Sequence, residues 1–200
     1  MNRNILVCGV GGQGTVLCSR LIASAFMAEG EQVHSAETIG MAQRGGSVTS
    51  HIRVGAGAFS PLIPDGRGDL ILAFEPAEAV RNLNYLKPDG IVIVNSQPVK
   101  PVTESLRKTG YDGTQMLSFL QEHYHKTYVV DSHEVCRQFG SLKFFNIIIL
   151  GVACGLGVLG VGKDTVVAEI EKIVKEKFVE VNKKAFAAGY LLGEHYVTDR

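Results

Sequence analysis

The stretch that decides the fold is Ile5-Leu6-Val7-Cys8-Gly9-Val10-Gly11-Gly12-Gln13-Gly14, at the start of the 200-residue sequence. A short apolar run leads into a glycine loop, and a segment with helical spacing of apolar residues begins at Thr15. This layout can bring backbone N–H groups up to an anion at a helix N-terminus. The spacing Gly9-x-Gly11-x-x-Gly14 fits the dinucleotide fingerprint, and Glu37 stands where a ribose-binding carboxylate is sought. Taken alone, the stretch predicts an NAD(P)-binding protein.

The composition is that of an ordinary globular protein. Hydrophobic residues make up 46% and charged residues 20% of the chain, and 20 basic residues balance 20 acidic ones. Since no basic run stands out, nothing favours nucleic acid binding. The longest apolar stretch, residues 144–159, is short for a membrane span and predicts a buried helix. The apolar run at residues 5–10 is too short for a signal sequence and ends in the glycine loop.

The cysteines are scattered, and no C-x-x-C motif is present. They are Cys8, Cys18, Cys136 and Cys154. A ferredoxin-type Fe–S cluster needs four thiolates at characteristic spacing, and a structural zinc site needs similarly clustered ligands. We therefore expect no metal on this chain, and we interpret the cysteines as reduced, mostly buried thiols of a cytoplasmic protein.

Strand and helix patterns alternate along the chain. Apolar runs predict strands at residues 3–8, 32–36, 47–54, 69–74, 91–94 and 128–130, with a turn at Pro88-Asp89-Gly90. Helical spacing predicts helices at residues 15–28, 75–86, 114–123, from 144, and one long last helix from Asp164. The first strand–helix–strand segment is a Rossmann-like βαβ unit, which implies a parallel strand pair. The alternation predicts one α/β domain, three-layer α/β/α with a mostly parallel sheet, ending in helices over about 144–192.

The strand expected at residues 47–54 has one face that is polar along its whole length. Ser47, Thr49, His51 and Arg53 fall on that face, which must look at solvent, at a partner or into a site. The loop before it, Gln43-Arg44-Gly45-Gly46, holds an amide and a guanidinium beside two glycines, and arginine favours bidentate contact with carboxylate or phosphate. Arg44 could instead pair with a neighbouring acid, but the polar face that follows favours a site or a subunit contact.

Other polar groups are less informative. The glycine loop could be a phosphate or carboxylate cradle or only a tight turn, and the Gln13 amide can both donate and accept hydrogen bonds. His123, His125 and His133 form no metal-ligand motif. Glu75 and Glu78 suit the start of a helix, where carboxylates are favoured by the helix dipole. No catalytic acid or base is supported.

Several motifs together resemble one known family. They are Gly9-Val10-Gly11-Gly12-Gln13-Gly14-Thr15, Gly40-Met41-Ala42-Gln43-Arg44-Gly45-Gly46-Ser47-Val48, Ser50-His51-Ile52-Arg53 and Ser60-Pro61-Leu62-Ile63. In order and spacing they resemble the gamma-type subunits of 2-oxoacid:ferredoxin oxidoreductases. The Met-Ala-Gln-Arg form and Phe74-Glu75-Pro76-Ala77-Glu78-Ala79 look most like the small (beta) subunit of indolepyruvate:ferredoxin oxidoreductases.

This resemblance implies a function for a complex rather than for one chain. The complex would oxidatively decarboxylate an aryl 2-oxoacid such as indolepyruvate to an acyl-CoA and CO2, and pass electrons to ferredoxin. Thiamine diphosphate, Mg²⁺ and Fe–S clusters would sit in a large partner subunit, and the isolated chain would be inactive. The residues that the resemblance implies at the coenzyme A side or the subunit interface are Gly9, Gly11, Gly12, Gln13, Gly14, Thr15, Gln43, Arg44, Gly45, Gly46, His51 and Arg53.

Two other functions remain open from the sequence. The opening fingerprint alone suits an NAD(P)-dependent oxidoreductase. Alternatively, the glycines only shape a docking surface, and the chain is a purely structural assembly subunit.

Overall fold

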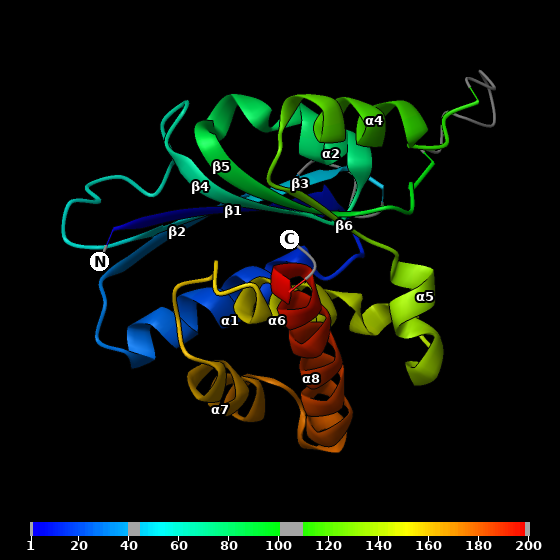
Figure 1. The fold of residues 1–200 in the computed structure, drawn as a ribbon. Helices are drawn as coiled ribbons and strands as arrows, with labels where there is room; N and C mark the ends of the chain where they lie inside the picture. The colour runs from blue at the N-terminus through cyan, green and yellow to red at the C-terminus, as the bar shows by residue number, and fades with distance from the viewer. Residues whose placement is uncertain (1, 40–44, 101–109, 199–200) are drawn as a thin grey trace.

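The computed structural model describes residues 2–39, 45–100 and 110–198 (Figure 1). These residues form a six-stranded sheet with the order β2-β3-β1-β4-β5-β6. The strands are β1 (Arg3–Val10), β2 (Val33–Ile39), β3 (Ser47–Val54), β4 (Gly68–Ala73), β5 (Leu86–Asn95) and β6 (Thr127–Val130). The helices are α1 (Thr15–Ala28), α2 (Pro76–Arg81), α4 (Thr114–His123), α5 (Ser132–Cys136), α6 (Phe145–Gly155), α7 (Lys163–Ile173) and α8 (Glu176–Thr198).

Helices cover both faces of the sheet. Figure 1 shows α2 and α4 over one face and α1, α6 and α8 over the other, which confirms the predicted three-layer α/β/α fold. β1 is buried on both faces: Ile5 and Val7 belong to one apolar cluster, and Leu6 and Cys8 to the other. A strand covered on both faces is expected to be apolar throughout, as this one is.

The sheet is mostly parallel, as predicted, but one strand runs against the rest. β1, β4, β5 and β6 pair in parallel, whereas β3 is antiparallel to both β1 and β2. The parallel β1–β2 pair expected from the βαβ pattern is therefore wrong, because β3 lies between these two strands. The connection from β2 to β3 is short, and short connections join antiparallel neighbours, which accounts for the pairing of β3 with β2.

Two predicted elements differ from the structure near β5. The turn expected at Pro88-Asp89-Gly90 is wrong, because these residues belong to β5. The pairing of β4 with β5 shifts register there, with Gly68 opposite Leu86 but Leu70 opposite Ile91. Extra residues in one strand form a bulge, where proline is tolerated without breaking the strand. The helix expected over residues 75–86 ends earlier, at Arg81.

The long last helix predicted from Asp164 is two helices, α7 and α8. Val174 separates them with an extended backbone, at φ −81° and ψ 142°. The apolar spacing continues across the break because both helices bury an apolar side, so periodicity alone does not reveal the change of direction.

The buried helix predicted from residue 144 is α6, which packs against α8 through backbone contacts. Both helices carry glycines four residues apart, Gly151 and Gly155 in α6 and Gly189 and Gly193 in α8. A Cβ at Gly151 would lie 2.3 Å from the Phe186 carbonyl oxygen. The close approach therefore requires glycine, and it fixes α8 against the helix at the centre of the core.

Within the residues that the structure describes, no single helix has the length and hydropathy to cross a membrane. Residues 132–139 and 142–155 reach these values only when taken together, across a bend of 109°.

We expect Gly151→Ala to lower the free energy of unfolding by about 2–3 kcal/mol, because the added methyl group forces α6 and α8 apart. Gly162→Ala is the matched control, since a Cβ at Gly162 would meet its nearest atoms at an ordinary 3.5 Å. Urea unfolding of the purified chain measures both. Equal midpoints for the two variants would contradict the close backbone packing.

Candidate functional site

A pocket of about 380 Å³ opens at the carboxyl ends of four parallel strands. The glycine loop after β1, Phe74 after β4, Asn95 and Gln97 at the end of β5, and Ser132 after β6 line it, together with His133 and Lys143. α1 leaves β1 toward one face of the sheet, and α2 leaves β4 toward the other (Figure 1). Open α/β sheets bind ligands at this kind of crevice between neighbouring strands.

The glycine loop presents the start of α1 to this pocket. Gly12 and Gly14 have left-handed backbones, with φ of 101° and 84°, that other residues rarely adopt. Gly14 is the N-cap of α1, where no side chain accepts a hydrogen bond from the helix, and the first turn contains no acidic residue. The first-turn N–H groups, starting at the buried Thr15, therefore lack a side-chain cap, which is the arrangement that suits an anion.

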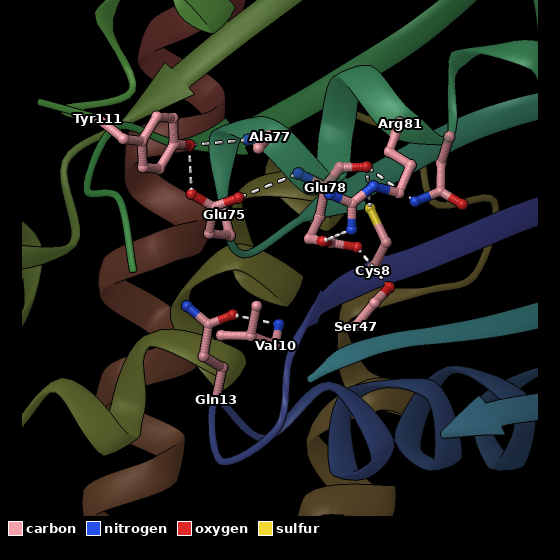
Figure 2. Close-up of polar contacts among 10 residues, drawn as sticks. Cys8, Val10, Gln13, Ser47, Glu75, Ala77, Glu78, Arg81 and Tyr111 are labelled. Carbon is pink, nitrogen blue, oxygen red and sulfur yellow. Dashed lines mark hydrogen bonds and ion pairs between the residues drawn. The ribbon is translucent and has the colours of Figure 1, made fainter. Parts of the chain in front are cut away.

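Gln13 points into the protein and holds the loop in place. Its Oε1 accepts from the Val10 N–H at 2.8 Å (Figure 2). Its Nε2 donates to the Phe74 carbonyl at 2.9 Å. A Cβ at Gly9 would lie 2.7 Å from that same Oε1, so glycine at position 9 makes room for the side chain. Both hydrogen-bonding functions of the Gln13 amide are thus used to join the end of β1 to the end of β4.

Asn95 continues this connection across the sheet. It is only 4% exposed, and its Nδ2 donates to the Phe74 carbonyl at 3.0 Å. Its Oδ1 accepts from the N–H groups of Gln97 and Ser132, both at 3.2 Å. One buried side chain therefore links the ends of β4, β5 and β6 behind the pocket.

Asp131, directly after β6, extends this set of hydrogen bonds at the carboxyl ends of the strands. Its carboxylate accepts from Gln97 Nε2 at 2.9 Å and caps α5 by accepting from the N–H groups of His133 and Glu134. Burial acts to raise the pKa of Asp131, but hydrogen bonds from Glu134, Gln97 and His133 outweigh it and lower the pKa. Asp131 is thus held as a charged cap.

The sequence motifs did not single out Asn95, Gln97, Asp131 and Lys143 as site residues. A usable signal was present, because Asn95 directly follows the apolar strand run at residues 91–94, and Asp131 and Ser132 follow the run at 128–130. Polar residues at the carboxyl ends of parallel strands lie along the same edge of a sheet.

The second predicted motif, at residues 43–46, contacts the glycine loop through backbone hydrogen bonds of Gly45 and Gly46. Gly11 N–H donates to the Gly46 carbonyl at 2.8 Å, and Gly45 N–H donates to the Gly11 carbonyl at 3.4 Å. Gln43 and Arg44 lie outside the described residues. The part of the motif that can be located therefore lies directly beside the first motif, where β3 begins opposite Val10.

His51 lies farther along β3, away from the pocket. It stands opposite Leu6 in the sheet, and 4% of it is exposed. Its Nδ1 accepts from the Ile63 N–H at 3.3 Å, and its ring meets that of Tyr85 edge-on at 5.0 Å between centroids. Burial lowers the pKa of His51, which favours the neutral ring.

Arg53 lies near the amino end of β1, opposite Asn4. Its guanidinium donates to Asn4 Oδ1 at 3.1 Å and to the carbonyls of Ser60 and Leu62 at 2.8 and 3.3 Å. In this structure His51 and Arg53 support the loop after β3, and neither lies among the residues of the carboxyl-edge pocket.

Two buried carboxylates lie on α2 or at its start, and that of Glu78 ties the helix to the sheet (Figure 2). Glu75 is the N-cap of α2, as suits a helix-start carboxylate; it accepts from Glu78 N–H at 3.0 Å and from the Tyr111 hydroxyl at 2.5 Å. Glu78 accepts from Ser47 Oγ at 2.6 Å and pairs with Arg81. The start of β3 is therefore tied to α2 as well as to the glycine loop.

The thiols are poorly suited to ligate metal. All four cysteines are free and buried, and burial raises the pKa of Cys8 well above its usual range and that of Cys18 to about 12. Burial also raises the pKa of Cys136 and Cys154 to about 11. Since thiolates are the ligating form, these groups do not fit a cluster. Among the described residues, no group of three or more His, Cys, Asp or Glu could hold a metal ion.

Comparison with known proteins gives a match over nearly the whole chain. The family described as "Pyruvate ferredoxin/flavodoxin oxidoreductase" matches residues 4–192. Indolepyruvate oxidoreductase subunit IorB of Archaeoglobus fulgidus is 37% identical over 191 residues, which are 95% of this chain and 94% of that protein.

Two solved structures share the fold. The gamma subunit of keto/oxoacid ferredoxin oxidoreductase from Geobacter sulfurreducens has a TM-score of 0.70 at 22% identity, covering 96% of this chain and 99% of that one. The 2-oxoglutarate:ferredoxin oxidoreductase of Magnetococcus marinus, solved with 2-oxoglutarate, coenzyme A and succinyl-CoA bound, has a TM-score of 0.72 at 18% identity. That match covers 97% of this chain but 31% of the longer chain.

We expect Asn95→Ala to lower the free energy of unfolding by about 2–4 kcal/mol, because it leaves the N–H groups of the half-buried Gln97 and the buried Ser132 without their acceptor. Asn84→Ala is the control, since this exposed asparagine makes a side-chain bond to Asp65 and should change stability by about 0.5 kcal/mol or less. Urea unfolding of both variants measures the difference. A loss in the free energy of unfolding no larger than that of Asn84→Ala would show that the side-chain hydrogen bonds of Asn95 do not stabilise the pocket.

We expect stability to fall with acidification through His51. Above the usual histidine pKa of about 6.5 the ring is neutral in both states. Below it, the unfolded chain binds a proton that the folded chain, with its lowered pKa, resists, so the free energy of unfolding decreases. His51→Asn keeps an acceptor for Ile63 but does not titrate. The drop in urea midpoint between about pH 7 and 5.5 should be smaller in His51→Asn than in the wild type or in the control His133→Asn.

Proposed function

Because this chain belongs to the pyruvate ferredoxin/flavodoxin oxidoreductase family, we propose that it is the small subunit of an indolepyruvate-type 2-oxoacid:ferredoxin oxidoreductase. The observation that carries the proposal is the 37% identity to an indolepyruvate oxidoreductase subunit over nearly the full length of both chains. The complex converts an aryl 2-oxoacid to an acyl-CoA and CO2 and passes two electrons to ferredoxin. Like other members of the family, the chain works together with other subunits.

The redox cofactors of the complex belong to its large subunit in this proposal. Thiamine diphosphate with Mg²⁺ supplies the decarboxylation chemistry, and Fe–S clusters carry the electrons. The buried, protonated thiols of this chain do not suit cluster ligation, which supports placing the clusters in the partner. We place the complex in the cytoplasm, because free thiols persist in a reducing compartment.

The carboxyl-edge pocket is the part of this chain that we assign to coenzyme A. Its volume of about 380 Å³ falls in the range of small-molecule sites, enough for a phosphate-bearing portion of the coenzyme. The left-handed Gly12 and Gly14 let the ligand approach the backbone, and the α1 N-terminus favours a phosphate. Lys143 adds a full positive charge at the pocket wall. Coenzyme A supplies the thiol that accepts the acyl group, while this chain binds and orients it.

The residues behind the pocket act by positioning. The side-chain amides of Gln13 and Asn95 both donate hydrogen bonds to the Phe74 carbonyl, which fixes the glycine loop relative to β4 and β5. Gly45 and Gly46 hold the other side of the loop through backbone hydrogen bonds to Gly11. We also propose Gln43 and Arg44 as residues at the coenzyme A side, because they belong to the same motif as Gly45 and Gly46.

The position of β3 counts against the NAD(P) alternative. In a dinucleotide-binding fold the acidic residue for the ribose stands on the strand beside β1. Here Glu37 is on β2, one strand farther away, and its carboxylate accepts from Ser19 Oγ at 3.3 Å. A phosphate at the α1 N-terminus is compatible with this sheet, whereas the usual ribose contact is not.

We expect Lys143→Glu to raise the KM for coenzyme A about tenfold in the purified complex, because a phosphate contact is replaced by repulsion. Lys184→Glu, an exposed lysine on α8, makes the same charge change and should leave that KM within about twofold. The assay follows reduction of ferredoxin with indolepyruvate as substrate, and the KM for the 2-oxoacid serves as an internal reference.

Other outcomes separate the alternatives. If Lys143→Glu leaves the KM for coenzyme A unchanged while assembly and turnover are normal, the pocket does not face the coenzyme, and a purely structural role is favoured. A rise in the melting temperature of the isolated chain on titration with NADH would instead support the dinucleotide-binding function.

A further inference from the structure

The buried carboxylate of Glu78 is bonded to the first residue of β3. Glu78 is only 3% exposed, and its Oε2 accepts from Ser47 Oγ at 2.6 Å (Figure 2). Its Oε1 pairs with the Arg81 guanidinium. Both carboxylate oxygens are therefore used, and because the acceptor is a charged group, its hydrogen bond to Ser47 is stronger than one between two neutral groups.

The backbone of Glu78 is fixed as well. Its N–H donates to the Glu75 carboxylate at 3.0 Å, and its carbonyl accepts from Asn82 Nδ2 at 2.8 Å. The same carbonyl accepts from Cys8 Sγ of β1 at 3.5 Å (Figure 2). Glu75, Asn82 and Cys8 are all buried. The acceptor that Glu78 offers to Ser47 is therefore held in place by both β1 and α2.

Ser47 connects Glu78 to the glycine loop. The residue before it, Gly46, accepts from the Gly11 N–H at 2.8 Å through its backbone carbonyl. Gly12, next to Gly11, lines the carboxyl-edge pocket. A continuous set of bonds therefore leads from the buried Glu78 through Ser47 to the pocket wall.

The glycine loop is thus held at two points by the segment 74–78. The Phe74 carbonyl accepts from Gln13 Nε2 at 2.9 Å, within the loop itself. Glu78, four residues later, acts on the loop from the β3 side, through Ser47. Because the contact of Gln13 stays in place when the Ser47 hydroxyl is removed, we expect the loop to loosen near Gly11 without unfolding.

The position of the glycine loop matters for a ligand that is bound through backbone groups. In the proposed function the pocket holds a phosphate at the N-terminus of α1, whose uncapped N–H groups directly follow Gly14. A hydrogen bond weakens steeply as its distance and angle depart from their best values. A displaced glycine loop therefore binds a phosphate less tightly, even though no charged group has been lost from the pocket.

We propose that Glu78 is a positioning residue for the coenzyme A site: through Ser47 it fixes the backbone of Gly11 and Gly12, and with it the wall of the pocket that receives a phosphate of the coenzyme. This inference rests on the proposed function, which supplies coenzyme A as the ligand. Glu78 and Ser47 are not among the residues that line the pocket, so both act through the backbone of the glycine loop.

A matched arrangement elsewhere in the chain provides the control. Ser24 of α1 donates to the carboxylate of Glu169, which is 4% exposed and pairs with Lys172 three residues later, as Glu78 pairs with Arg81. This contact joins α1 to α7, near the end of α1 that is farther from the pocket. Ser24→Ala therefore removes the same kind of hydrogen bond, to an equally buried carboxylate, without disturbing the glycine loop.

The test measures the KM for coenzyme A and the amide hydrogen exchange of residues 9–14 in the purified complex. We expect Ser47→Ala to raise that KM about fivefold and to speed the exchange, because the bond from Gly11 N–H to Gly46 loosens. Ser47→Thr keeps a hydroxyl and suits a strand, so it should hold both values within about twofold of the wild type. Ser24→Ala should lower the urea midpoint about as much as Ser47→Ala but leave the KM and the exchange unchanged.

A double variant links the effect to Glu78. Glu78→Gln replaces the charged acceptor of Ser47 by a neutral one and should raise the KM for coenzyme A about threefold. Since both residues act through one hydrogen bond, Glu78→Gln combined with Ser47→Ala should raise the KM no more than Ser47→Ala alone. Effects that multiply to about fifteenfold would show that the two residues act independently, and would contradict the inference.

The outcomes distinguish this inference from the proposed function. A wild-type KM for coenzyme A in Ser47→Ala, together with a raised KM in Lys143→Glu, overturns the positioning role and leaves the proposed function intact. An equal rise of the KM in Ser24→Ala also overturns the positioning role, because lower stability would then be the cause. A wild-type KM in both Ser47→Ala and Lys143→Glu overturns the assignment of the pocket to coenzyme A, and this inference with it.

Discussion

The site depends on one backbone oxygen, the carbonyl of Phe74. It accepts the amide of Gln13 at 2.9 Å and the amide of Asn95 at 3.0 Å, and these side chains come from the segments that follow or end β1 and β5. Asn95 in turn holds Ser132 after β6, so hydrogen bonds join four parallel strand ends. A buried polar group left without its partner lowers the free energy of unfolding by about 1–3 kcal/mol. Breaking these hydrogen bonds is therefore unfavourable, and they keep the glycine loop in one position.

The second constraint is the place of β3 between β1 and β2. Because it is antiparallel to both neighbours, its first residues lie beside the glycine loop and its last residues lie at the amino end of β1. The start of β3 therefore places Ser47, with Gly46 directly before it, beside the glycine loop, and the same strand contributes His51 and Arg53 to the support of the β3–β4 loop (residues 55–67). The same insertion moves Glu37 away from β1, so a fingerprint that suggests a dinucleotide belongs to a sheet that does not provide the usual ribose contact.

These constraints give the two ends of the sheet different uses in the proposed complex. The carboxyl end offers uncapped helix N–H groups and Lys143 to an anionic ligand, whereas at the amino end the β3–β4 loop exposes Phe59 and Leu62. The sheet between them is buried on both faces, and α6 and α8 pack backbone to backbone beneath it. A rigid core of this kind can hold a loop at one end and a pocket at the other in a fixed relation.

The sequence by itself determined the three-layer α/β/α fold, the extents of α1 and β3 and the family, because these follow from local periodicity and from motifs contiguous in the chain. Tertiary structure alone decided where β3 inserts, since strand order depends on pairing between distant segments. It also decided that α7 and α8 are separate, that Pro88 lies within a strand, and that Gln13 turns inward. Asn95 joined the site for the same reason: hydrogen bonds to the ends of neighbouring strands exist only once the sheet has formed.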